Sequence, residues 1–219
     1  MNIHIFDIDH TLIKRSTTHA FIRAGLNKGF ITLPQIAKIP WKWILYKLAV
    51  IEPEFIEIEV RKYKNIPQKV LTDLSIESFD NYGKKHLYAE GIALINELKE
   101  KGERIIVATS SVDFFIEPIM KFLGIDEYIS TRLEFVDGVT TGRTIGNAVF
   151  GKNKLNAVVE YFRNKGLSLD NAAFYSDSYN DLPLLEACGQ AVPVNPDSRL
   201  RKEAKRQGWT CRNFHKTLG

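Results

Sequence analysis

The chain has 219 residues, 44% of them hydrophobic and 11% aromatic, with a formal net charge of +4 at pH 7. That much apolar material can build a well-buried core and excludes a disordered chain. Much of the positive excess lies near the end, where Glu203 is surrounded by Arg199, Arg201, Lys202, Lys205, Arg206 and Arg212. Such a run can contact nucleic acid, but we interpret it as a solvated helix face and expect no nucleic-acid partner.

The cysteines and the first residues bear on the cellular compartment. Cys188 and Cys211 have neither metal-ligand spacing nor a neighbouring histidine cluster, so we expect two reduced thiols in a cytoplasmic protein. The first residues lack the basic and apolar regions of a signal peptide and indicate instead a short apolar strand at 2–6.

After this strand the pattern is helical over a long segment, from about residue 15 to 88. Its most apolar part, 31–51, is interrupted by lysines and prolines and therefore does not predict a membrane span. Five large apolar residues in this part recur at helical spacing, namely Trp41, Ile44, Leu45, Leu48 and Ile51. Two interpretations remain open: a helix packed against its neighbours, or an amphipathic surface that rests on lipid headgroups.

From residue 91 onwards, helices and strands alternate. The predicted helices are 92–101, 113–123, 152–165, 180–187 and 198–207. The predicted strands are 104–108, 172–175 and 190–194, with two short strands within 127–146 around the turn Asp137-Gly138. Alternation of this kind is typical of βαβ units whose parallel sheet is covered on both faces.

We therefore predict an α/β fold with a Rossmann-like parallel sheet at its core. Residues 1–14 and 89–219 would form the core, and residues 15–88 would form an all-helical cap domain inserted after the first strand. Both ends of the insertion return to the carboxyl end of that strand. Ligands bind at this edge in open α/β folds, so the insertion is placed to act as a lid.

Two carboxylates follow the first strand directly. Only Ile8 separates Asp7 from Asp9, and Thr11 comes shortly after them. Such a pair can share a divalent cation, and one carboxylate can act as a nucleophile. A turn or a helix cap is the alternative, because so short a motif also arises by chance.

Three further polar elements follow later strands. Thr109 and Ser110 precede a predicted helix, where a hydroxyl and helix-initiating N–H groups can face an anion or simply cap the helix. Lys154 opens a helix, an unfavourable place for a cation unless an anion lies beside it; the alternative is an exposed lysine. Asp177 and Asp181 supply a second acidic pair, which an octahedral Mg²⁺ site needs.

Together these elements resemble the four signature motifs of the haloacid dehalogenase superfamily of phosphohydrolases. The motifs stand here as Asp7-Ile-Asp-His-Thr11, Thr109, Lys154 and Asp177-Ser-Tyr-Asn-Asp181. Within the superfamily the chain is similar to the phosphoserine-phosphatase-like branch. That similarity rests on the stretches 114–118, 151–154 and 181–185 and on the helical insertion between the first two motifs.

The resemblance implies a mechanism. Asp7 would attack phosphorus and form an aspartyl-phosphate. Asp9 would protonate the leaving alcohol and then take a proton from the hydrolytic water. Mg²⁺ would be held by Asp7, Asp177 and the backbone carbonyl of Asp9.

The resemblance also implies a phosphate site. Thr11, Thr109, the N–H of Ser110 and Lys154 would bind the phosphoryl group and offset its charge. Asp181 would position Lys154 or a metal-bound water.

The implied function is Mg²⁺-dependent hydrolysis of a small-molecule or lipid phosphate ester. A phosphoserine phosphatase proper and a phosphotransferase would use the same residues, so both stay open. A dehalogenase has no need of the second carboxylate at Asp9. A module that only displays a phosphorylated aspartate is the alternative outside enzymes, although such receiver domains are shorter and lack a helical insertion.

The loop after the first motif bears on the substrate. In phosphoserine phosphatases a glutamate nine positions beyond the nucleophile helps to hold the ammonium group of the substrate, and Ser16 takes that place here. A hydroxyl supplies no counter-charge, and the nearby Lys14 and Arg15 repel an ammonium. We therefore expect free phosphoserine to be a poor substrate and a more acidic or amphiphilic ester to be preferred.

Overall fold

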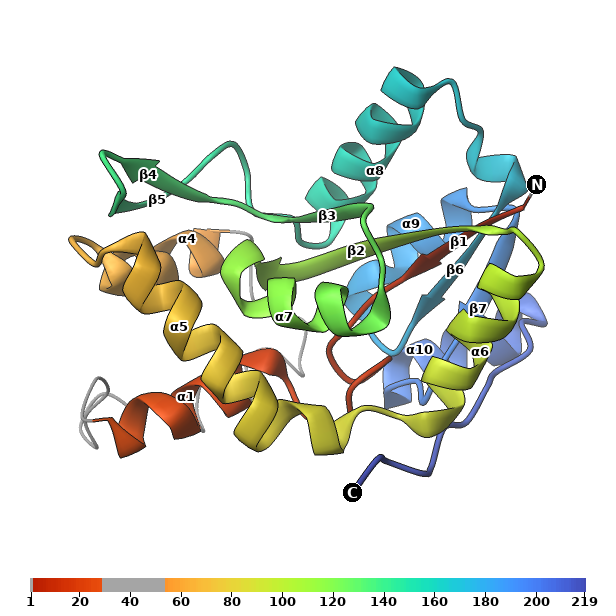
Figure 1. Ribbon diagram of the computed structural model, residues 1–219. Coiled ribbons are helices and arrows are strands. Elements are labelled where there is room, and N and C mark those ends of the chain that lie inside the picture. Colours follow the sequence, from red (N-terminus) through yellow and green to blue (C-terminus); the bar gives the residue numbers. More distant parts are fainter. Residues whose placement is uncertain (1, 29–53) are drawn as a thin grey trace.

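The computed structural model describes residues 2–28 and 54–219, which are arranged around a five-stranded sheet (Figure 1). Its strand order is β3-β2-β1-β6-β7, and every neighbouring pair is parallel. The strands are β1 (Ile3–Phe6), β2 (Arg104–Val112), β3 (Tyr128–Thr131), β6 (Ala172–Ser176) and β7 (Gln190–Pro193). The predicted α/β class with a parallel central sheet is confirmed.

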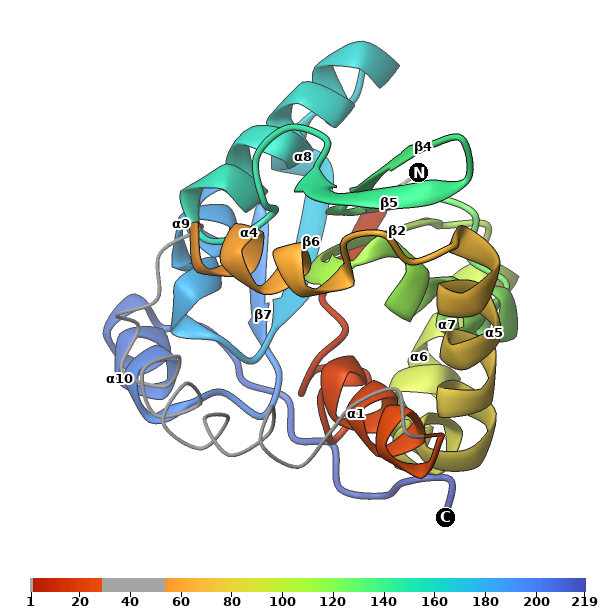
Figure 2. The same ribbon diagram turned by 90° about the vertical axis from the view of Figure 1, so that its left-hand side faces the viewer.

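Apolar side chains on both faces of the sheet explain why it is covered on both sides. On β2, Ile105 and Val107 pack into one hydrophobic cluster, whereas Ile106 and Ala108 pack into the other. The first cluster includes α6 (Ala89–Glu100) and α7 (Asp113–Leu123). The second includes α8 (Lys152–Lys165), α9 (Leu182–Ala187) and α10 (Ser198–Gln207). Figure 2 shows the two sets of helices on opposite sides of the strands.

Between β1 and α6, every regular element that the structure describes is a helix. These helices are α1 (Thr17–Asn27), α4 (Glu54–Val60), η1 (Arg61–Tyr63), α5 (Gln68–Ser78), the π-helix η2 (Phe79–Gly83) and η3 (Lys84–His86). We call the described residues 17–27 and 54–86 the helical segment. The division into a core and a cap domain at residues 15 and 88 stays a prediction.

Aromatic packing joins the helical segment to the sheet layer. The ring of Phe21 on α1 meets the rings of Phe114 and Phe115 on α7 edge-on, with centroid distances of 5.5 Å and 4.6 Å. All three side chains are buried. Edge-to-face pairs of this kind add about 0.5–1.5 kcal/mol each beyond the area that they bury. The first helix of the segment is therefore anchored beside the end of β2.

The region 127–146 contains three strands where the sequence predicts two. β3 joins the main sheet, while β4 (Leu133–Val136) and β5 (Val139–Thr144) form an antiparallel hairpin. Asp137 and Gly138 both have positive φ, 50° and 73°, as the predicted tight turn requires. The sequence missed β3 because only Arg132 separates it from β4.

The hairpin is also tied to the helical segment. The N–H of Asn65 donates to the carbonyl of Thr140 at 2.8 Å, and the N–H of Thr140 donates to the carbonyl of Ile66 at 2.9 Å. A third bond of 2.8 Å runs from the N–H of Gln68 to the carbonyl of Gly138. These backbone bonds fix the hairpin against the chain between η1 and α5.

The two connections between the sheet and the helical segment lie side by side. The N–H of Lys14 donates to the carbonyl of His86, and the N–H of Tyr88 donates to the carbonyl of Leu12, both at 2.9 Å. Residues 216–218 add a third row, because the N–H of Ala89 donates to the carbonyl of Lys216 at 2.8 Å. We call residues 12–14, 86–89 and 216–218 the seam.

The predicted amphipathic helix around Trp41 to Ile51 lies outside the described residues. Within the ranges 2–28 and 54–219, no helix combines the length and the apolar character that are needed to cross a membrane.

Candidate active site

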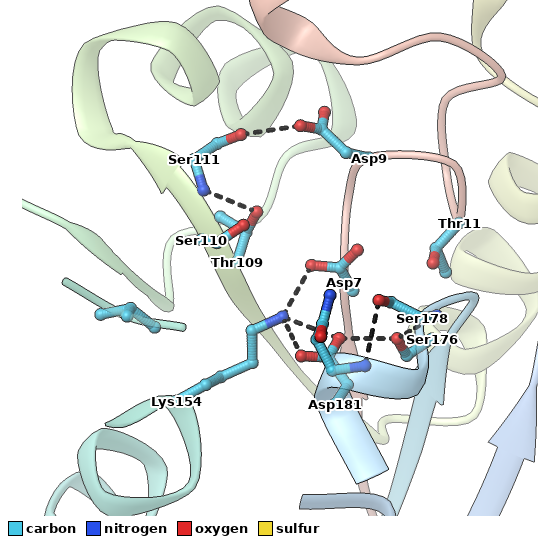
Figure 3. Close-up of polar contacts among 12 residues, drawn as sticks. Asp7, Asp9, Thr11, Thr109, Ser110, Ser111, Lys154, Ser176, Ser178 and Asp181 are labelled. Atoms are coloured by element: carbon cyan, nitrogen blue, oxygen red, sulfur yellow. Dashed lines mark hydrogen bonds and ion pairs between the residues drawn. The ribbon is translucent and has the colours of Figure 1, made fainter. Parts of the chain in front are cut away.

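The carboxyl ends of the central strands bring the predicted polar residues to one edge of the sheet. Asp7 follows β1 directly, and its N–H donates to the carbonyl of Tyr175 on β6 at 2.9 Å. Its side chain is buried. Figure 3 shows Lys154 and Asp181 pointing toward it from two other elements.

Lys154 is fully buried and paired with two carboxylates. Its Nζ lies 3.0 Å from Oδ1 of Asp7 and 2.7 Å from Oδ1 of Asp181. Gly151, which precedes α8, has φ 54° and ψ −125°, a conformation that favours glycine and starts the helix so that Lys154 falls in its first turn. Because Lys154 is buried, the alternative of a solvent-exposed lysine is wrong. An anionic partner lies beside it, as a cation in the first turn of a helix requires.

Electrostatics keep this lysine charged. Burial alone would lower the pKa of Lys154, but the carboxylates of Asp181 and Asp7 hold it above its ordinary value. Asp181 is itself fixed, because the hydroxyl of Ser176 donates to its Oδ2 at 2.6 Å. A buried ammonium whose position is set by a second carboxylate thus lies against Asp7.

Asp177 is connected to the first motif through Thr11. The N–H of Asp177 donates to Oγ1 of Thr11 at 3.0 Å, and the hydroxyl of Thr11 lies 3.4 Å from Oδ1 of Asp177. Thr11 is fully buried and supports Asp177 through this contact, while its predicted part in the phosphate site stays a prediction. Burial raises the pKa of Asp177, and the neighbouring carboxylates of Asp7 and Asp181 raise it further.

The acidic groups at this edge fit a hard divalent cation. Burial also raises the pKa of Asp7, with Lys154 acting in the opposite direction. Burial therefore disfavours the ionised form of both carboxylates, and a cation beside them would favour it. In the described part of the chain, no three or more histidine, cysteine, aspartate or glutamate side chains gather as a metal site. One or two carboxylates completed by a carbonyl and waters is the usual set for Mg²⁺, so the residues fit that ion.

Thr109 and Ser110 lie inside β2, which corrects the expected strand end at residue 108. β2 continues to Val112, and α7 begins only at Asp113, so the N–H of Ser110 does not initiate that helix. The reason is the continued pairing with β3, in which Val112 lies opposite Thr131 after a register shift. The hydroxyl of Thr131 donates to the carbonyl of Ser110 at 3.0 Å and fixes this irregular stretch.

Thr109 nevertheless keeps a hydroxyl hydrogen that can be donated. Its side chain is fully buried, and its Oγ1 accepts the N–H of Ser111 at 3.2 Å. The bond uses a lone pair of the oxygen and leaves the hydrogen for another acceptor.

Asp9 is held by two residues that the sequence did not single out. Its Oδ1 accepts the N–H of Thr17 at 2.8 Å, and its Oδ2 accepts the hydroxyl of Ser111 at 2.9 Å (Figure 3 for Ser111). The run Ser16-Thr17-Thr18 is a helix-start signal, which could have pointed to free N–H groups there. Nothing in the sequence shows which carboxylate those groups face.

Ser16 serves as the N-cap of α1. Its Oγ accepts the N–H of His19 at 3.3 Å. Lys14 and Arg15 are exposed, and Nη1 of Arg15 lies 3.0 Å from Nε2 of His19. The loop after the first motif is therefore basic at its surface, and its serine is engaged with the backbone of the helix.

Comparison with known proteins identifies the family. A family model described as haloacid dehalogenase-like hydrolase matches residues 5–186. A histidinol-phosphatase of Neisseria meningitidis is 30% identical over 219 residues, which cover 97% of this chain and 99% of that protein. The phosphoserine phosphatase SerB1 of Mycobacterium tuberculosis is 28% identical over 226 residues, or 95% of this chain and 70% of that protein.

Solved structures share the fold. A crystal structure of a protein of unknown function from Bordetella pertussis superposes with a TM-score of 0.85 at 24% identity, covering 96% of this chain and 97% of the other. A substrate-bound phosphoserine phosphatase gives a TM-score of 0.73 at 17% identity, with coverages of 96% and 92%. The chain belongs to the haloacid dehalogenase-like hydrolase family, and its phosphatase-named relatives place it among the phosphatases of that family.

Proposed function

We propose that the chain is a Mg²⁺-dependent phosphomonoester hydrolase that works through an aspartyl-phosphate on Asp7. The observation that carries the proposal is the buried contact of 3.0 Å between Nζ of Lys154 and Oδ1 of Asp7. A carboxylate enclosed at a strand end, beside a fixed ammonium, can attack phosphorus while the positive charge offsets that of the phosphoryl oxygens.

The first half of the reaction forms the covalent intermediate. A carboxylate oxygen of Asp7 attacks phosphorus in line, and the bond between phosphorus and the ester oxygen breaks. Asp9 gives its proton to that oxygen, which leaves as an alcohol. Lys154, the hydroxyl of Thr109 and the N–H of Ser110 bind the phosphoryl oxygens as their charge shifts.

The second half returns the enzyme to its starting state. Asp9, now ionised, takes a proton from a water molecule that attacks phosphorus. The bond between phosphorus and the Asp7 oxygen breaks, which releases inorganic phosphate and frees the Asp7 carboxylate. Asp181 holds Lys154 in place through both halves, since Nζ lies 2.8 Å from its Oδ2.

Asp7, Asp177 and the backbone carbonyl of Asp9 would hold Mg²⁺. When bound, the ion offsets the negative charge of the phosphate ester and the acidic edge. The support for this assignment is that Asp7 and Asp177 directly follow the paired strands β1 and β6 and offer hard oxygen donors.

We propose a small-molecule phosphate ester as substrate, in keeping with relatives named for histidinol phosphate and phosphoserine. The N-cap role of Ser16 supports a substrate whose binding does not depend on a carboxylate at that position. Phosphoserine phosphatase activity and transfer of the phosphoryl group to a second alcohol are the competing functions. The lipid-phosphate interpretation depended on the basic loop at Lys14 and Arg15 and on residues 41–51, of which the latter lie outside the described residues, and the relatives named for small-molecule esters do not support it.

A direct experiment tests the proposal. Phosphate release from p-nitrophenyl phosphate and from a panel of phosphorylated metabolites is measured with and without Mg²⁺. Trapping the intermediate by borohydride reduction and locating the modified residue by mass spectrometry should identify Asp7. Release of phosphate with no modification at Asp7 would contradict the covalent route. Formation of a new phosphate ester only when an acceptor alcohol is added would indicate a phosphotransferase.

A further inference from the structure

The Asp9 carboxylate is enclosed by donors from two sides of the molecule. Thr17 offers its N–H to Oδ1 at 2.8 Å, and its hydroxyl oxygen lies 3.4 Å from Oδ2. Ser111 offers its hydroxyl to Oδ2 at 2.9 Å. The two hydroxyl oxygens lie 2.9 Å apart, and because the Ser111 hydrogen goes to Asp9, the Thr17 hydroxyl is the donor between them. Both residues are buried, with exposed fractions of 4% for Thr17 and 8% for Ser111.

The two partners come from different parts of the fold. Thr17 is the first residue of α1, so its N–H is among the helix-initial groups that have no acceptor inside the helix. Ser111 lies on β2 in the sheet. The orientation of Asp9 therefore depends on α1 and β2 being in place together.

The hydrogen bonds to the two carboxylate oxygens of Asp9 indicate which of them can carry the transferred proton. Oδ2 receives the Ser111 hydroxyl, with the Thr17 hydroxyl nearby, whereas among the described residues the donor to Oδ1 is the N–H of Thr17. A carboxylate oxygen has two lone pairs, so Oδ1 keeps one that can hold a proton. A backbone N–H cannot rotate, and it thereby fixes the direction of that lone pair.

We propose that Thr17 and Ser111 are positioning residues that orient Asp9 so that its Oδ1 exchanges the proton with the ester oxygen. This inference rests on the proposed phosphatase function. In the step concerned, the Oδ1–H bond breaks and an O–H bond forms on the leaving oxygen, which takes the electron pair of the broken P–O bond. The side chains of Thr17 and Ser111 act through the orientation of Asp9, while the backbone N–H of Ser111 donates to Oγ1 of Thr109 and is kept in Ser111→Ala.

Leaving-group dependence separates this role from a merely structural one. Nitrophenolate leaves without a proton, whereas an alkoxide must be protonated as it leaves. We expect Ser111→Ala to lower kcat/KM for glycerol phosphate about tenfold, the usual effect of losing a hydrogen bond to a charged group. Thr17→Val keeps the N–H that holds Oδ1 and removes only the hydroxyl that contacts Ser111, so it should give a smaller loss on the same substrate. For p-nitrophenyl phosphate, kcat/KM should change less than about twofold, because phosphoryl transfer to Asp7 then needs no acid. Thr17→Ser keeps the hydroxyl and should restore the activity towards glycerol phosphate.

The chain offers matched controls. Ser130 on β3 is buried, and its hydroxyl has no hydrogen-bond partner among the described residues, so Ser130→Ala makes the same chemical deletion without touching Asp9. Thr18 is the exposed neighbour of Thr17 and gives Thr18→Val as a surface control. Both controls should keep the ratio of the two kcat/KM values at the wild-type level.

The outcomes are distinguishable. Equal losses on both substrates in Ser111→Ala and Thr17→Val, or no loss on either, would overturn the positioning role. If Ser111→Ala unfolds, as its circular dichroism would show, the Thr17→Val and Thr17→Ser pair decides. Asp9→Asn serves as the reference variant. If Asp9→Asn lowers kcat/KM more for glycerol phosphate than for p-nitrophenyl phosphate, and Thr17→Val does not, the inference fails and the proposed function stands. If the wild type releases phosphate from neither substrate, the proposed function itself is wrong.

Discussion

The ammonium of Lys154 lies 2.7 Å from one carboxylate oxygen of Asp181 and 2.8 Å from the other. The same Nζ is 3.0 Å from Oδ1 of Asp7, and the exposed fractions of the Lys154 and Asp181 residues are only 2% and 3%. Asp181 therefore holds the ammonium through both of its carboxylate oxygens, and Asp7 contacts the same ammonium through Oδ1. A substitution at Lys154 should affect both the stability of the fold and the chemistry at Asp7.

Lys154→Met should lower the free energy of unfolding by about 3–5 kcal/mol, because two buried carboxylates lose their common counter-charge. Urea denaturation at neutral pH measures the change. Lys152→Met is the control, since Lys152 is exposed in the same helical turn and its loss should alter the value by less than about 0.5 kcal/mol. A Lys154→Met protein as stable as the wild type would show that the pair contributes little to the fold.

Asp7→Asn should remove the nucleophile and leave the fold intact. We expect kcat to fall by at least about 10³, as for the loss of other catalytic groups. Steady-state phosphate release gives the rate, and thermal unfolding verifies that the variant is folded. Asp126→Asn, at an exposed position before the amino end of β3, should behave as wild type. Turnover by Asp7→Asn at the wild-type rate would exclude Asp7 as the nucleophile.

Asp9→Asn should keep the metal and lose proton transfer. The expected ligand at this position is the backbone carbonyl, which the substitution retains, whereas loss of general acid–base help costs about 10²–10⁴ in rate. Isothermal titration with Mg²⁺ and kinetics with esters of different leaving groups measure the two properties. If Mg²⁺ binding disappears and easily departing groups give no rescue, the proton-transfer role of Asp9 is wrong.

Removal of divalent metal should silence the enzyme, and Mg²⁺ should restore it. Asp7 and Asp177 are hard oxygen donors, and Mg²⁺ prefers such ligands in a small octahedral site. High Ca²⁺ should inhibit, because its larger and looser coordination disturbs the in-line approach to Asp7. Phosphate release before and after exhaustive chelation measures the effect. Undiminished activity of the chelated protein would count against a metal-dependent mechanism.

Free phosphoserine should be a poor substrate, because Ser16 gives its ammonium no counter-charge and its oxygen already caps α1. Losing such a charge-assisted contact costs about ten- to a hundredfold in kcat/KM. Comparison of phosphoserine with glycerol phosphate and lysophosphatidate, which carry no ammonium group, measures the preference. A tenfold advantage of phosphoserine over the other esters would refute this interpretation of Ser16.

A matched pair of substitutions isolates the charge at this position. Ser16→Glu should raise kcat/KM for phosphoserine relative to Ser16→Gln, since both replace the cap and only one adds a carboxylate. Equal values for the two variants would show that position 16 does not face the ammonium group.

Several features of the site could be predicted from the sequence because they depend on local signals. An apolar strand that ends in Asp7, and a glycine three residues before Lys154, place these side chains at the carboxyl edge of a parallel sheet. The pairing of β2 with β3 could not be predicted, since it depends on contacts across the sheet, and it moved Ser110 into a strand. The contacts of Thr17 and Ser111 with Asp9 span 8 and 102 positions along the chain. Such contacts arise from tertiary packing alone.

The seam and the β4–β5 hairpin together restrict how the helical segment can move. At the seam, backbone hydrogen bonds such as that between Lys14 and His86 join the two connections, and at the other attachment Asn65 and Thr140 are bonded. The aromatic contacts of Phe21 with Phe114 and Phe115 are a further attachment of the segment to the sheet layer. Any motion that carries α5 away from the sheet must therefore either take the hairpin along or cost the three backbone bonds that hold it. Residues 133–144 are thus attached to the helical segment, although more than forty positions of the sequence separate the two.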